Sequence, residues 1–141
     1  MDQQTFNIKF QRIELLEKTM ALNPGLKDGQ QFNFNITAAP NIDLEKKLYV
    51  TFIKVNIMPI GSDLIMASVH VALGFEIEKF DEVFNTNEDG KTLIPIDLDK
   101  MLRSISISTT RGILASELRG TYLNEAILPI IDPNAFTSIS Q

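Results

Sequence analysis

Residues 98–122 read LDKMLRSISISTTRGILASELRGTY, and this stretch decides the fold. It can form one helix of about 22 residues, which would span roughly 33 Å. Gly120 is a natural residue for the left-handed turn that ends a helix, so we predict a helix over residues 98–119. The stripe predicted to face the core has helical spacing and consists of Leu98, Leu102, Ile105, Thr109 and Ile113.

The start of this helix is predicted at Asp97 as the N-cap, with Asp99 in the first turn, where a carboxylate favours the helix dipole. Another side of the helix carries small residues, and a glycine in the middle of a helix costs roughly 1 kcal/mol relative to Ala. Such a glycine indicates the close approach of the sheet or of another helix. We therefore predict that Ser108, Gly112 and Ala115 form an interface in a homo-oligomer, a tetramer.

The part of the chain before this helix reads as four strands. Apolar residues alternate from Phe6, and the alternation changes phase near Arg12, which indicates a β-bulge or a strand buried on both faces. Further alternation predicts strands over residues 32–37, 48–58 and 65–77, joined by short turns. The predicted fold class is α+β: a four-stranded antiparallel sheet packed on one long helix of the C-terminal half, in a single domain over residues 1–141.

Composition excludes several functional classes. The chain has 141 residues, a net charge of −5, 44% hydrophobic residues and no cysteine. An acidic chain is unsuited to nucleic acid or to anionic lipid, and the lack of cysteine excludes disulfides and thiolate sites. The start, Met1-Asp2-Gln3-Gln4, has no signal-peptide pattern, and no apolar run is long enough to span a membrane. We expect a cytoplasmic protein without membrane insertion.

No arrangement of residues indicates catalysis. His70 is the single histidine and lies between Val69 and Val71 on a predicted strand, without a nucleophile motif elsewhere. Asp97 and Asp99 resemble a carboxylate pair, but acids at a helix start more often serve the dipole. We therefore expect no enzymatic activity, no catalytic residue, no cofactor and no metal.

An apolar segment without clean periodicity follows the helix. It can cover the core, or it can border a groove for extended apolar polypeptide with phenylalanines of the preceding loop on the far side, and both roles can hold together. The predicted client-binding residues are Phe80, Phe84, Tyr122, Leu123, Ile127 and Leu128.

The helix exit carries a resemblance to a known family. Arg119-Gly120-Thr121-Tyr122, followed by Pro129-Ile130 and Phe136, resembles the helix exit of the SecB family of bacterial export chaperones. Gln11-Arg12-Ile13 in the first strand is similar to that family's Gln-Arg-Ile. The resemblance implies a dimer of dimers that holds unfolded polypeptides in long apolar grooves between sheet-edge loops and helix.

The chain also departs from the family pattern. We expect the family's second helix and its tail to be essentially absent, since the chain has five residues after Phe136. Glu17 matches one acid of the family's dock for the translocation motor, but Ala21 and Ser68 replace two others. The predicted function is an ATP-independent holding chaperone for unfolded or precursor polypeptides. Protein export is one pathway for it, and whether the translocation motor is a partner stays open. Two alternatives remain: a toxin–antitoxin-associated chaperone of the same fold, and a domain that binds a small apolar ligand.

Overall fold

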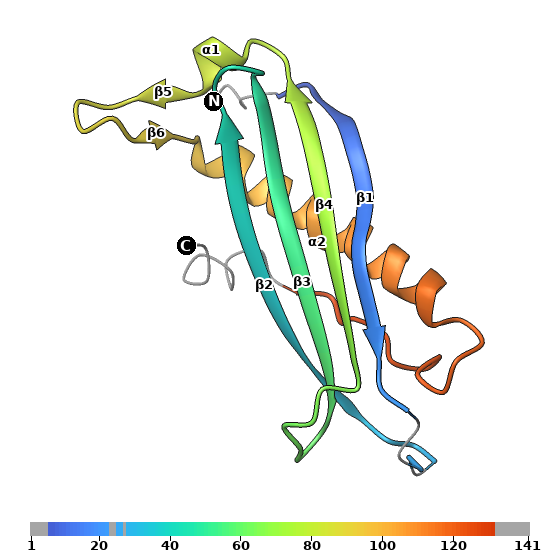
Figure 1. Cartoon of the computed structure of the whole chain (residues 1–141). Helices are drawn as coiled ribbons and strands as arrows, with labels where there is room; N and C mark the ends of the chain where they lie inside the picture. Colours follow the sequence, from blue (N-terminus) through green and yellow to red (C-terminus); the bar gives the residue numbers. More distant parts are fainter. Residues whose placement is uncertain (1–5, 23–24, 27, 132–141) are drawn as a thin grey trace.

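The computed structural model describes residues 6–22, 25–26 and 28–131. It has a four-stranded antiparallel sheet with one long helix behind it, which confirms the predicted α+β class (Figure 1). A small hairpin projects beside the sheet. The elements are β1 (Ile8–Met20), β2 (Phe32–Asp43), β3 (Leu48–Pro59), β4 (Ala67–Ile77), α1 (Phe80–Val83), β5 (Asn85–Thr86), β6 (Thr92–Leu93) and α2 (Ile96–Leu118).

The strands of the sheet lie in the order β1-β4-β3-β2. β1 and β2 are therefore the two edges, and the connection between them passes below the sheet in Figure 1. The turn between β3 and β4 lies at this same end, which we call the lower end. The turn between β2 and β3 and helix α1 lie at the opposite, upper end. Pro40 is tolerated within β2 because β2 is an edge strand.

The phase change predicted in the first strand is a β-bulge. The pairing of β1 with β4 shifts between Phe10 and Arg12, and again between Leu15 and Glu17. At the first shift, Gly74 of β4 faces the extra residue: a Cβ there would lie 2.7 Å from Gln11 Oε1. Only glycine accommodates this bulge without displacing the side chain.

Helix α2 buries a different row of residues from the predicted stripe. Ile105, Thr109 and Ile113 are only half-buried. A row that advances by four residues at every step is inclined to the helix axis by about 26°. It therefore faces the sheet when the helix crosses the strands diagonally, as α2 does in Figure 1. The buried row is Leu98, Leu102, Ser106, Thr110, Leu114 and Leu118, with Ile107 beside it.

The two ends of α2 test the predicted caps. The N-cap is Pro95 rather than Asp97, and the Asp99 N–H donates to the Pro95 carbonyl at 2.9 Å. Asp97 and Asp99 both lie inside the first turn, where their charge still meets the positive end of the helix. At the other end Gly120 has a φ of 79°, which confirms its predicted left-handed conformation.

Candidate polypeptide-binding surface

Two of the predicted client-binding residues close the upper end of the core. Phe80 begins α1 and Phe84 follows its last residue, and their rings stack with centroids 4.4 Å apart. Both side chains are buried in the same core cluster as Tyr49 and Phe75 of the sheet. A buried ring cannot contact a client unless α1 moves, so in this structure the pair serves the core.

The segment after α2 covers the core as well. We call residues 120–131 the strap, which in Figure 1 returns from the end of α2 behind the sheet. Its side chains Leu123, Ala126 and Leu128 are buried in the core cluster. Ile127, between two of them, is 66% exposed, so only this predicted apolar contact is open to solvent. Burial of Leu123 and Leu128 thus favours core closure over direct client contact.

The strap is held by side chains that bind main-chain carbonyls. The Tyr122 hydroxyl donates to the Ala21 carbonyl at 2.6 Å, and burial raises the pKa of this hydroxyl above its ordinary value. The Arg111 guanidinium donates through Nε to the Leu128 carbonyl and through Nη2 to the Pro129 carbonyl, both at 2.9 Å. These bonds fix the strap at its start and near its end.

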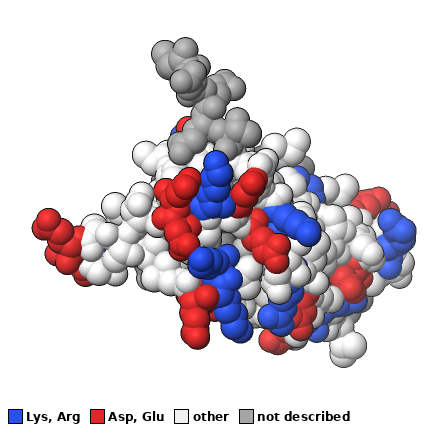
Figure 2. Space-filling model, turned by 90° about the horizontal axis from the view of Figure 1, so that it is seen from above, with Lys and Arg blue, Asp and Glu red and all other residues white. Residues whose placement is uncertain are grey.

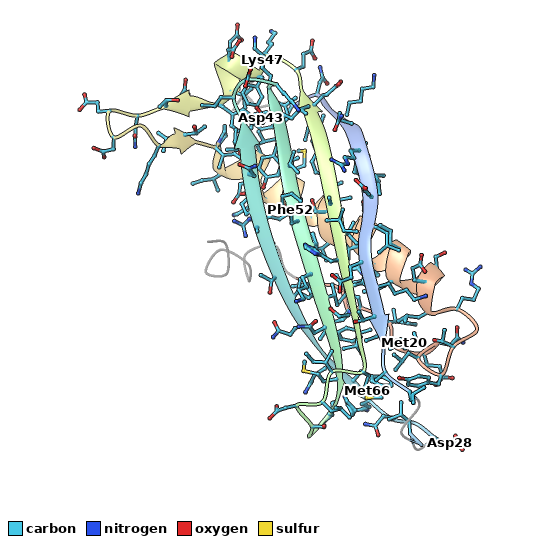
Figure 3. The ribbon with its side chains drawn as sticks, in the orientation of Figure 1. Met20, Asp28, Asp43, Lys47, Phe52 and Met66 are labelled. Carbon is cyan, nitrogen blue, oxygen red and sulfur yellow. The ribbon has the colours of Figure 1, made fainter. Side chains whose placement is uncertain are left out.

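A surface that the sequence analysis missed lies at the lower end. Met20 and Met66 lie close together there (Figure 3), and the Ala21 N–H donates to the Met66 carbonyl at 2.8 Å. Around this contact the loops expose large aliphatic side chains, and Leu22 is 94% exposed. We call this surface the end patch; it consists of Leu22, Ile60, Leu64 and Ile65.

The sequence contained a weak signal for the end patch. The alternation of apolar residues predicts that the fourth strand starts at Ile65, but in the structure β4 begins at Ala67. Leu22 precedes an Asn-Pro-Gly turn and follows the first strand, so it reads as a loop residue. Apolar residues beside turn signals are a hint of an exposed patch, but only the fold brings the two loops together.

An open cleft of about 470 Å³ adjoins the end patch. It lies between the connection from β1 to β2 and the start of the strap. Tyr122 and Phe32 form its aromatic part, and Asp28, Gln30 and Glu125 make it otherwise polar. The cleft is therefore a mainly polar surface that water can enter, and none of the end-patch residues lines it.

The predicted oligomer interface lies on the solvent side of α2. Ser108, Gly112 and Ala115 are all exposed in the protomer. A Cβ added at Gly112 would meet nothing within 4 Å, so the sheet does not require glycine there. From the sequence, this glycine indicates the close approach of either the sheet or another helix. The sheet is excluded, so the explanation that remains is a helix of another chain.

On the face seen from above, charges do not gather as a field of one sign (Figure 2). Lysines and arginines alternate with acids on the upper end (Figure 2). On the outer sheet face Arg12 pairs with Glu14, and Glu17 lies opposite His70 on the neighbouring strand. Glu17 alone therefore does not make this face a strongly acidic docking site of the kind that the SecB family uses for the translocation motor.

Tyr49 is a buried ionisable group of the core. Burial raises the pKa of Tyr49 far above its ordinary value; Asp99 adds to the rise and Arg103 opposes it. Asp99 itself is paired with Arg103 at 3.1 Å, so it serves an ion pair. In the described ranges, no three His, Cys, Asp or Glu residues come together to hold a metal ion. No helix of those ranges is long and apolar enough to cross a membrane.

Comparison with known proteins places the architecture. No protein-family model matches the chain. No curated protein matches it either. A solved structure does: the Mycobacterium tuberculosis Rv1957 SecB-like chaperone in complex with a ChAD peptide from the Rv1956 HigA1 antitoxin. The TM-score is 0.62 at 16% sequence identity, and the match covers 88% of this chain and 89% of that chain. Phe136, part of the resemblance noted above, lies outside the described residues. The chain therefore has a SecB-like fold.

Proposed function

We propose that this protein is an ATP-independent holding chaperone that binds unfolded polypeptides. The observation that carries the proposal is the end patch, where four aliphatic side chains are exposed together at one end of a SecB-like sheet. Unfolded chains share exposed apolar side chains and little else, so a tolerant binding surface must be apolar. Contiguous exposed apolar residues mark interaction sites more often than scattered ones do.

The energetics suit holding rather than permanent capture. Full burial of one large aliphatic side chain contributes about 1.5–3 kcal/mol. Four such side chains give useful affinity, from which the entropy lost on binding must be subtracted. Ile127 and Tyr122 extend the same surface along the strap, and we propose them as further client contacts. Phe80, Phe84, Leu123 and Leu128 would reach a client only if their segments moved.

The partner is proposed to be polypeptide, in the cytoplasm and without an enzymatic step. The similar chaperone of known structure was solved with a peptide from an antitoxin, which supports a polypeptide client for this fold. Protein export and association with a toxin–antitoxin system remain two alternatives for the pathway. Identification of the proteins that co-purify with the native protein distinguishes the two pathways. Many different precursors would indicate export, whereas one antitoxin would indicate a toxin–antitoxin system.

The alternative of a small apolar ligand has less support. The space enclosed between β2, β3 and α2, beside Tyr49 and Ser106, measures about 10 Å³. That volume holds about one water molecule, whereas small-molecule sites have roughly 300–1,000 Å³. The cleft beside Tyr122 is larger but open and lined with acids.

The proposed assembly is a homo-oligomer, a dimer of dimers, with the solvent side of α2 as one contact. Exposed Ser108, Gly112 and Ala115 would let a second helix approach closely. Gly112→Leu should disrupt this contact and lower the mass measured by sedimentation. Gly112→Ala is the matched control, because it fills little space and favours the helix by roughly 1 kcal/mol. A wild-type mass of 15.8 kDa at micromolar concentration would refute the assembly.

The function is tested by light scattering of an aggregating protein. Citrate synthase diluted from denaturant, without nucleotide, should aggregate less when this protein is present at equal molar concentration. An unrelated folded acidic protein of similar mass serves as the control for nonspecific effects. Equal scattering in both samples would refute holding activity.

A further inference from the structure

The second half of the strap, residues 126–131, is a coil beside α2, and we call the space that the strap fills there the groove; residues 121–126 form consecutive turns. Arg111 lies about two helical turns before α2 ends, yet it contacts Leu128 and Pro129 of the strap. The chain has therefore turned back and runs beside the helix. It fills the groove with Leu123, Ala126 and Leu128, all buried in the core cluster.

The attachment of the strap differs from that of a secondary-structure element. Residues 127–131 make no hydrogen bond from main chain to main chain within the described part of the protein. Instead, Arg111 donates to two successive carbonyls, of Leu128 and Pro129. A carbonyl is present in every residue, so this contact accepts an extended chain of any sequence.

The solvent side of residues 127–131 is also apolar, whereas Asn124 and Glu125 earlier in the strap are exposed and polar. Ile127, between the buried Ala126 and Leu128, is 66% exposed, and Ile130 is 92% exposed. A segment that only closed a core would gain from polar residues on its outer side. Apolar residues on both sides, in a coil held through its carbonyls, are the properties expected of an unfolded client segment.

The start of the strap lies next to the end patch. The Tyr122 hydroxyl binds the Ala21 carbonyl, and Ala21 directly precedes Leu22 of the end patch. A polypeptide captured at the lower end is therefore close to the start of the strap. The polar surface that it meets there is the open cleft beside Tyr122.

We propose that the strap is an internal ligand, and that an extended apolar segment of a client binds along α2 by displacing it. This inference rests on the proposed holding function and specifies its second site. Closed strap and bound client exclude each other, so the apparent affinity equals the intrinsic affinity multiplied by the fraction of molecules with an open strap. Release of the strap also exposes Leu123 and Leu128 as additional apolar contacts.

The experiment uses the absence of cysteine from the chain. In the full-length protein, Ala126→Cys places a single thiol on a buried strap position, and Leu128→Cys provides a second one should the first variant be unstable. Asn124→Cys, on an exposed strap position, is the control. The client probe is reduced, carboxamidomethylated α-lactalbumin, which is permanently unfolded and has no free thiol. The rate of reaction with a thiol reagent is measured with and without saturating probe.

Displacement predicts that the probe accelerates labelling at Ala126→Cys several-fold, while labelling at Asn124→Cys remains fast. Arg111→Ala should accelerate labelling without probe several-fold, since it removes two charge-assisted hydrogen bonds of the closed strap. Its affinity for the probe should change little, because the larger open fraction is offset by the loss of the same hydrogen bonds to the bound client. Arg119→Ala removes the same charge from the exposed end of the helix and should change neither value.

The outcomes separate this inference from the function on which it rests. Binding of the probe with unchanged or slower labelling at Ala126→Cys would show that the strap stays closed, and would refute displacement alone. Failure of the unmodified protein to bind the probe would refute the holding function and the role of the strap together.

Discussion

The two ends of the sheet differ in how they are closed. At the upper end α1 places Phe80 and Phe84 over the core, and Lys47 in the turn between β2 and β3 pairs with Asp81 at 2.7 Å. At the lower end the end patch leaves its aliphatic side chains without a cover in the protomer. Leu44 is also exposed at the upper end, and so are Leu93 and Ile96 where the chain passes from β6 into α2. Leu44 lies among charged residues in the sequence, which is ordinary for a protein surface. The comparison shows that α1 covers the core at the upper end, whereas the lower loops leave aliphatic side chains exposed, where we propose the client contacts.

The largest effect should come from opening the closed end. Phe84→Ser removes a buried ring and its stacking partner's contact, so it should lower the free energy of unfolding by about 3–5 kcal/mol. Urea denaturation measures this change. Holding by the fraction that remains folded should stay the same, because the ring serves the core. Phe52→Ser, at a half-buried ring of the outer face, is the control and should be milder (Figure 3). A stable Phe84→Ser protein with weak holding would reverse our assignment of the two ends.

The second effect comes from changing the open end. The double variant Leu22→Ser and Leu64→Ser removes two exposed contacts, so client affinity should fall at least tenfold, about 1.4 kcal/mol. The melting temperature should hardly change, since both residues are solvent-exposed. Titration of the labelled unfolded probe measures the affinity. Leu44→Ser at the upper end is the matched control, with a side chain 51% exposed in the protomer. Equal losses in both proteins would mean that apolar exposure in general, and not the end patch, determines binding.

A third effect concerns pH and acts at the closed end. Burial raises the pKa of Tyr49 in the folded state above the unfolded value of about 10. Above that pH the unfolded chain loses the proton while the folded chain retains it, so stability falls by up to about 1.4 kcal/mol per pH unit. Tyr49→Phe should reduce this slope in urea titrations between pH 9 and pH 11. Tyr122, the other tyrosine, shifts in the same direction and leaves a residual slope. An unchanged slope in Tyr49→Phe would show that this hydroxyl is not held neutral by the core.

The architecture was predictable because it depends on local periodicity. Alternation located the strands, and the phase change near Arg12 located a bulge. The helix ends within two residues of its predicted limits, and Gly120 stops it as expected. The buried row of α2 was not predictable in the same way. Ser106 and Thr110 are polar residues that lie at core positions of α2. They are buried because the helix crosses the sheet diagonally, and the crossing angle depends on the sheet. Thr110 satisfies its hydroxyl within the helix by donating to the Ser106 carbonyl at 2.8 Å.

The candidate site was less predictable than the fold. Apolar residues after α2 have the same composition whether they cover a core or border a groove, and only tertiary contact separates Leu123 from Ile127. The end patch joins two loops that are far apart in sequence. Their proximity follows from the pairing of β1 with β4, a long-range choice that periodicity does not specify.

The smallest effect tests the closure of the upper end by charge. Lys47 and Asp81 are both largely exposed, so their ion pair should contribute less than about 0.5 kcal/mol, and Lys47→Ala should be nearly neutral. Lys46→Ala is the control, since the side chain of Lys46 makes no ion pair with the described residues. Lys47 also has a φ of 58°, a conformation that costs a residue with a Cβ roughly 1–2 kcal/mol. Lys47→Gly removes both the pair and this strain, so it should stabilise the protein although it removes a contact. Urea midpoints of the three variants decide the matter: a Lys47→Ala protein clearly less stable than Lys46→Ala would mean that the ion pair contributes more than expected. A Lys47→Gly protein no more stable than Lys47→Ala would mean that the left-handed conformation of residue 47 carries no strain.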